Sequence, residues 1–233
     1  GVDATQVHEV VGTNGIPEFG TTLAKDMLRE IRPKTVNELI KISGLSHGTD
    51  VWNGNARDYM LGMKKEVGPI EFKDLIGCRD DIMNYLLSKG LPAISAFKIM
   101  ESVRKGHGVS GEFEEEMLRY QVPEWYIDSC KMIQYMFPKA HASAYVIMAL
   151  RIGWFKVYRP LQYYAAYFSR RANVFDIIAM AGGYSSINLR VKELEDLIKI
   201  KRASNKEIDI YNCLLLALEM TARGLDRKST RLN

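Results

Sequence analysis

Residues 137–171 read FPKAHASAYVIMALRIGWFKVYRPLQYYAAYFSRR, and they contain the longest helical pattern of the chain. One helix is predicted over residues 142–158. It ends before Pro160, because proline lacks the amide hydrogen that a helix interior needs. A second helix is predicted over residues 161–171. Two successive helices here, with helical periodicity on either side, indicate an all-α fold.

The rest of the chain repeats this pattern of helices separated by Pro and Gly. Thr35 is expected to cap one of them, with Glu38 completing a capping box. Residues 43–55 are predicted to form a Gly-, Ser- and Asn-rich loop, and residues 64–69 a turn. No convincing strand or internal repeat is found. The further predicted helices are 21–31, 35–42, 80–89, 92–105, 123–136, 185–201 and 205–223.

Charge is unevenly distributed along the chain. The net charge of +4 is too small to require a nucleic-acid partner, but no Asp or Glu lies between positions 128 and 176. The basic residues of that stretch are Lys131, Lys139, Arg151, Lys156, Arg159, Arg170 and Arg171. Such a block of one sign is typical of a surface that binds phosphate groups.

Composition indicates a globular protein in a reducing compartment. The chain has 233 residues, of which 47% are hydrophobic and 26% charged, and its three cysteines lie far apart without zinc-ligand spacing. No signal peptide or membrane-spanning run is present, so a cytoplasmic protein is expected. Residues 226–233 break from the helical pattern and resemble translated adaptor or vector sequence, so they are interpreted as a non-native tail.

Lys139, His141 and Tyr145 lie at the start of the 142–158 helix. There the two basic side chains can meet phosphate together with the first helix amides. Tyr145, one turn further on, can stack on a base. The other interpretation is that the aromatic residues of this region belong to the core; these are Tyr145, Phe155, Tyr163 and Tyr167.

Three further segments carry candidate binding residues. The Ser43–Trp52 sequence SGLSHGTDVW can wrap a polar ligand, or it is an ordinary loop anchored by Trp52. Arg79 opens a helix and can clamp phosphate, whereas Asp80 and Asp81 are better explained as helix-start residues than as metal ligands. Lys98 and Lys105 share a helix face near Arg104, a basic stripe that binds phosphate or is simply solvated.

No Ser-His-Asp set, GxGxxG fingerprint or HExxH motif is visible, so nothing indicates a self-contained active site. Taken in order, however, the motifs closely resemble those of the PolC-type alpha subunit of bacterial DNA polymerase III, a C-family DNA polymerase. The matching segments are GIPEFG (15–20), RPKT (32–35), SGLSHGTDVW (43–52), IGCRDDIM (76–83), AFKIMESVRKG (96–106), VPEWYIDSC (122–130) and YMFPKAHASAY (135–145). Residues 60–72 depart from the family pattern and are left unassigned.

The resemblance implies the fingers region of such a polymerase over residues 1–171. Residues 172–225 would then form a helical segment leading toward a helix-hairpin-helix duplex-binding domain that is absent here. Fingers of this family close over the incoming dNTP and the template base, while palm aspartates outside this chain hold Mg²⁺ for two-metal transfer. The implied nucleotide-binding residues are Ser43, His47, Arg79, Lys98, Arg104, Lys139, His141 and Tyr145. The predicted DNA-binding residues are Lys105, Arg151, Lys156 and Arg159.

The implied partners are template–primer DNA, dNTPs and the remaining polymerase domains (palm, thumb and duplex-binding domain), with a sliding clamp bound by regions outside the chain. No metal or cofactor is expected within residues 1–233, and no membrane partner. The chain alone should be inactive as a polymerase. The alternatives are a stand-alone helical nucleic-acid-binding module and a protein-interaction module with a basic face.

Overall fold

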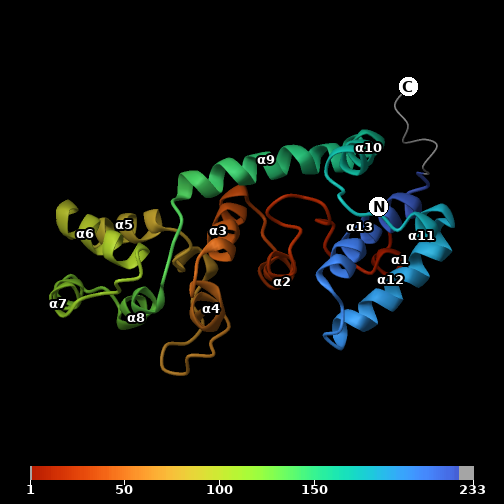
Figure 1. The fold of residues 1–233 in the computed structure, drawn as a ribbon. Helices are drawn as coiled ribbons and strands as arrows, with labels where there is room; N and C mark the ends of the chain where they lie inside the picture. Colours follow the sequence, from red (N-terminus) through yellow and green to blue (C-terminus); the bar gives the residue numbers. More distant parts are fainter. Residues whose placement is uncertain (1, 226–233) are drawn as a thin grey trace. The chain divides into compact units, whose positions relative to one another are not determined.

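The computed structural model describes residues 2–225, so the predicted non-native tail at 226–233 lies outside the described residues. The predicted all-α fold is confirmed: within residues 2–225 no strand forms, and the single β-bridge joins Thr49 to Tyr135 (Figure 1). The helices are α1 (Ala4–Val7), α2 (Thr22–Ile31), α3 (Val36–His47), α4 (Arg57–Met60), α5 (Arg79–Ser88), α6 (Ala93–Arg104), α7 (Gly111–Arg119), α8 (Glu124–Met132), α9 (Lys139–Tyr158), α10 (Pro160–Arg170), α11 (Ile177–Ala181), α12 (Gly183–Lys199) and α13 (Asn205–Ala222), with short turns at Trp52–Ala56 and Phe72–Asp74.

The chain divides into two compact units. Unit 1 contains the described residues up to Thr21 and those from Met148 onward, and unit 2 contains residues 22–147. Helix α9 begins in unit 2 and continues into unit 1. These boundaries differ from the sequence-based division after residue 171, and the assignment of 1–171 and 172–225 to polymerase regions stays a prediction.

Helix α3 corrects one predicted boundary. The Thr35–Glu38 capping box forms as predicted, but the helix continues to His47 instead of yielding to a loop at Ser43. Gly44 faces the backbone of Gly77 so closely that a Cβ atom would lie 2.4 Å from the Gly77 carbonyl oxygen. The small residues of this segment therefore allow close packing of a helix, and that packing overrides their preference for loops.

Helix α9 begins three residues before the predicted start. The Asp80 carboxylate accepts a hydrogen bond of 2.6 Å from the Lys139 amide, so a residue from the start of α5 satisfies one of the first orphan donors of α9. Pro160 has the role expected of it, because it occupies the first turn of α10, where no amide hydrogen is needed. The long helix and its proline stop are thus as predicted, and only its first turn was missed.

Each unit has its own hydrophobic core. In unit 1, α12 and α13 pack side by side (Figure 1). The buried residues between these helices and α11 are Ala179, Ile187, Val191, Leu194, Leu214, Leu215, Ala217 and Leu218. In unit 2, α5 packs on α6, and Tyr85 stacks on the buried Tyr126 with 4.1 Å between ring centroids. A buried pair, in which the Ser129 hydroxyl donates to the Asn55 side chain at 2.6 Å, joins α8 to the turn before α4.

Candidate nucleic-acid interface

Residues 134–138 of unit 2 connect the ends of three helices. The Thr49 amide, just after α3, donates to the Tyr135 carbonyl at 3.0 Å. The Arg79 amide donates to the Phe137 carbonyl at 3.2 Å, and the Met136 amide donates to the Arg104 carbonyl at 3.3 Å. The end of α3, the start of α5 and the end of α6 therefore all lie against the segment that leads into α9.

A row of aromatic rings follows this segment into α9. Measured between ring centroids, Phe137 lies 5.0 Å from Tyr135 and 6.0 Å from His47. It is stacked on His141, with 5.0 Å between the centroids. His141 in turn lies 4.7 Å from Tyr145, whose side chain is 48% exposed. We call these five residues the ring row. It brings His47, His141 and Tyr145 together and presents an exposed tyrosine ring at its end.

Three cations surround the Glu101 carboxylate. Arg104 donates to it in a bidentate fashion at 2.5 and 2.9 Å, Lys105 lies at 3.2 Å, and Arg79 lies at 3.9 Å. We call Arg79, Arg104 and Lys105 the cation cluster. The hydrogen bond from Arg104, together with Lys105, lowers the pKa of the Glu101 carboxyl to about 2. One acid cannot neutralise three cations, so the cluster keeps positive charge for an anionic ligand.

This pKa predicts how the cation cluster responds to acid. Because the folded-state pKa of Glu101 falls from an ordinary value of 4.5 to about 2, the pairing contributes its full stability above pH 4.5 and loses it as the pH falls toward 2. A carboxyl-carbon NMR titration is expected to find the Glu101 midpoint well below 4. The signal is assigned by its absence in Glu101→Gln, and a midpoint near 4.5 would show that the ion pairs do not form.

Two of the other predicted residues remain available to a ligand. Lys98 is exposed on α6, and no ion-pair partner of it lies within the described part of the chain. Lys139 is partly exposed in the first turn of α9, two residues before His141. Their role as phosphate contacts stays a prediction.

Two expectations about this surface are corrected. Ser43 lies within α3 and is only 1% exposed, so packing against the core keeps its hydroxyl away from a nucleotide. The first amides of the helix predicted from residue 142 were expected to meet phosphate, but the helix starts at Lys139, and the Lys139 amide already donates to Asp80. An anionic ligand at the start of α9 would have to compete with the Asp80 carboxylate for this amide. Any phosphate contact there would therefore come from the side chains of Lys139 and His141.

The carboxylates Asp80 and Asp81 have structural tasks. Asp81 accepts hydrogen bonds from the Gly77 and Cys78 amides and lies 3.7 Å from the Lys41 ammonium. This is the helix-start role that the sequence favoured over metal binding. Within residues 2–225 no group of three His, Cys, Asp or Glu side chains is placed to hold a metal ion. No helix in that range is long and apolar enough to span a membrane.

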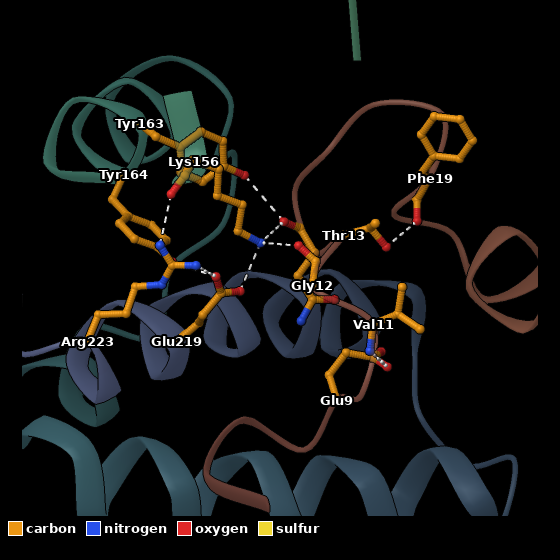
Figure 2. Close-up of polar contacts among 11 residues, drawn as sticks. Glu9, Val11, Gly12, Thr13, Phe19, Lys156, Tyr163, Tyr164, Glu219 and Arg223 are labelled. Atoms are coloured by element: carbon orange, nitrogen blue, oxygen red, sulfur yellow. Dashed lines mark hydrogen bonds and ion pairs between the residues drawn. The ribbon is translucent and has the colours of Figure 1, made fainter. Parts of the chain in front are cut away.

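In unit 1, the structure contradicts the predicted DNA contact of Lys156. Its side chain is buried, its ammonium lies 2.9 Å from the Glu219 carboxylate, and it donates to the Gly12 and Asn14 carbonyls at 2.9 and 2.7 Å (Figure 2). Glu219 also pairs with Arg223 at 3.0 Å. A lysine with all its donors engaged in the interior cannot reach a phosphate at the surface.

The other residues of α9 and α10 divide between surface and core. Arg151 and Arg159 are exposed, as a DNA-binding role requires. Tyr163 and Tyr164 are buried, so the core interpretation holds for Tyr163, whereas Tyr145 and Phe155 are 48% and 49% exposed. Trp154 and Tyr158 are exposed as well. Aromatic content alone did not distinguish these two groups.

Sequence reasoning missed several residues that build this surface. Lys41 holds the segment before α5 by donating to the Lys73 and Leu75 carbonyls at 2.6 and 2.7 Å. Glu101 organises the cation cluster, and its spacing of three and four residues from Arg104 and Lys105 is a usable sequence signal. Phe137 joins His47 to His141, and nothing in the sequence pairs those residues.

Comparison with known proteins identifies the family. A family model described as the bacterial DNA polymerase III alpha subunit finger domain matches residues 4–121. The protein named DNA polymerase III PolC-type in Pediococcus pentosaceus is 52% identical over 228 residues, which is 98% of this chain and 15% of that protein. Proteins of the same name in Bacillus cereus and Thermotoga maritima are 53% and 50% identical over 96% of the chain.

The chain spans about 15% of the length of the curated relatives it matches. The similarity extends over nearly the whole chain and so continues past the segment that the finger-domain model covers. The predicted resemblance is therefore confirmed: this chain belongs to the bacterial DNA polymerase III alpha-subunit family, in its PolC-type branch, and contains the fingers region.

Proposed function

We propose that this chain serves as the fingers of a replicative DNA-directed DNA polymerase, where it binds the incoming dNTP and template–primer DNA. The observation that carries the proposal is the meeting of the cation cluster and the ring row on one segment of unit 2. The two groups share this segment, and together they offer positive charge and aromatic rings, which match a triphosphate joined to a base. The family supports this assignment, because its polymerases act on such substrates.

Each group has a distinct task in this proposal. Arg79 and Arg104 are the best phosphate contacts, because a guanidinium offers paired donors that match phosphate oxygens. Lys98 and Lys139 add positive charge at the edges. Tyr145 supports the base of the nascent pair by stacking. The His141 ring packs against the tyrosine ring, with 4.7 Å between the ring centroids.

DNA is proposed to meet the exposed cations of both units. Lys105 is half-exposed and lies within the cation cluster, whereas Arg151 and Arg159 are exposed on unit 1. Contacts of this kind bind the backbone without reading sequence, and they weaken as salt rises. A polymerase needs such contacts because it must hold every template sequence equally.

The chemical step is assigned to residues outside this chain. Asp80 and Asp81 are occupied with backbone amides, so they do not offer the free carboxylates that Mg²⁺ prefers. We therefore place the Mg²⁺ ligands in the palm of the full-length enzyme, where the ions would activate the primer hydroxyl and stabilise the leaving pyrophosphate. The sliding clamp is likewise assigned to other regions. The 233-residue chain alone is expected to extend no primer.

A substitution of Tyr145 in the polymerase that carries this chain tests the proposal. Tyr145→Ala is expected to raise the dNTP KM roughly ten- to hundredfold, since stacking on a base contributes about 1–3 kcal/mol. Tyr145→Phe keeps the ring and should stay near the wild-type value. Single-nucleotide incorporation at varied dNTP concentration gives both constants.

A matched control is Tyr158→Ala, which removes an exposed tyrosine from the other end of α9. If Tyr145→Ala and Tyr158→Ala leave the dNTP KM equally unchanged while both weaken DNA binding, the ring row is not a nucleotide site. The stand-alone nucleic-acid module would then be the better description.

A further inference from the structure

Unit 1 contains an apolar pocket that none of the proposed ligand contacts uses. It has a volume of about 380 Å³ and is lined by residues of the second half of α9 and by one face of α10. This volume is within the range of roughly 300–1,000 Å³ found for binding pockets. Its lining residues are Gly15, Ile152, Phe155, Gln162, Tyr163, Ala166, Tyr167, Arg170 and Arg171.

The walls of the pocket are held in place by contacts behind them. The Tyr163 hydroxyl donates to the Asn14 carbonyl at 3.3 Å, so its ring is fixed at the inner wall. Gly15 allows the chain to pass against that ring, because a Cβ atom there would lie 2.4 Å from the Tyr163 oxygen. The Tyr167 ring lies next to that of Tyr163, with 6.4 Å between the ring centroids and 29° between the ring planes. The pocket therefore exists before any ligand arrives.

The rim of the pocket is positively charged. Arg170 and Arg171 are exposed at the end of α10, and neither has an acidic partner within residues 2–225. The interior, in contrast, is formed by rings and aliphatic groups. A nucleobase placed inside would leave polar edge atoms without hydrogen bonds, which costs about 1–3 kcal/mol for each such group. An apolar side chain would pack against the walls of the pocket, and a carboxylate next to it in the sequence could pair with Arg170 or Arg171 at the rim.

We propose that this pocket receives a bulky apolar side chain, flanked by Asp or Glu, from a segment of the same polymerase polypeptide outside this chain. The relatives are far longer than the chain, which covers only about 15% of them, so most of the polypeptide is available to dock here. An anchor in a pocket with a charged rim is the usual form of a binding hot spot. This proposal depends on membership of the polymerase family and not on the proposed nucleotide contacts.

Site-specific cross-linking in the full-length polymerase tests this docking. Gln162 lines the pocket and is exposed, so p-benzoyl-phenylalanine in its place can report on the occupant. Irradiation is expected to join it to a peptide of the same polypeptide, outside residues 1–233, that carries a bulky apolar residue next to Asp or Glu. The product should keep the mass of a single chain.

Three variants separate a filled pocket from a chance neighbour. Ala166→Trp fills the pocket and should lower the cross-link yield roughly tenfold or more, as for the loss of a central anchor. Arg170→Glu combined with Arg171→Glu should lower the yield as well, by repelling the acidic flank. Ser169→Trp, an exposed position of α10 that does not line the pocket, should leave it unchanged.

Cross-links to DNA, to a second copy or to a separate protein would overturn the proposal, as would no cross-link or a yield that Ala166→Trp does not change. This readout needs no nucleotide. A negative result would therefore leave the proposed dNTP site intact, and loss of that site would leave the docking result intact.

Discussion

Replacing Arg79 with alanine in the polymerase is expected to lower kcat/KM for dNTP roughly ten- to hundredfold. A hydrogen bond to a charged group contributes about 1.5–3 kcal/mol, and each 1.36 kcal/mol corresponds to a factor of ten in rate. Arg79 stands at the start of α5, its amide is fixed by the Phe137 carbonyl, and its side chain is only weakly engaged with Glu101 at 3.9 Å. A weakly paired guanidinium on a fixed backbone suits a phosphate contact.

The variant is best compared with two others. Arg79→Lys keeps the charge but loses the paired donors, so an intermediate effect is expected. Arg119→Ala removes an exposed arginine from α7 of the same unit and should have no effect. Single-turnover incorporation separates the change in KM from that in kcat. Equal kinetics for Arg79→Ala and Arg119→Ala would remove Arg79 from the site.

Replacing Lys156 with methionine should destabilise unit 1 by roughly 3–5 kcal/mol, the usual cost of breaking a buried ion pair from one side. The ammonium holds Glu219 and two carbonyls in the interior, and the backbone of Lys156 is itself bound by Arg223 (Figure 2). Methionine fills a similar volume, so the loss would not come from a cavity. It would come from the Gly12 and Asn14 carbonyls, which lose their donor, and from Glu219, which keeps Arg223 but loses its buried lysine.

Native-state hydrogen exchange at the α13 amides measures this cost, because it reports the free energy of local opening. Lys192→Met, at an exposed position of α12, is the matched control and should change little. Combining Lys156→Met with Glu219→Leu should cost less than the two single changes added together, because the two side chains pair with each other. Protection of α13 that is the same in Lys156→Met and Lys192→Met would mean that Lys156 is not a buried anchor.

The fold could be read from the sequence largely because its helices are marked by local signals. The box of Thr35 and Glu38 and the stop at Pro160 depend on neighbours in the chain. The end of α3 could not be read in this way, because Gly44 and its neighbours favour a loop locally, whereas in the structure Gly44 packs closely against the Gly77 backbone. The extent of this helix is therefore tied to a contact between two segments that are far apart in the sequence.

The same distinction explains the candidate site. Arg79 was found in one motif, and Arg104 and Lys105 in another. The spacing of Glu101 from Arg104 and Lys105 is visible in the sequence, but its contact with Arg79 exists only because α5 packs on α6. Lys156 was misjudged because an acid-free run of sequence gives no information on burial, and its carboxylate partner Glu219 lies far along the chain on α13.

The contacts of Lys156 also have a consequence for sequence variation. On the N-terminal side its ammonium binds the main-chain oxygens of Gly12 and Asn14, and the Asn14 oxygen accepts from Tyr163 as well. A Cβ atom added at Gly12 would meet nothing within 4 Å. A side chain at position 12 should therefore be tolerated. Inserting or deleting one residue there, in contrast, would displace the two carbonyl oxygens from the Lys156 ammonium and break these hydrogen bonds.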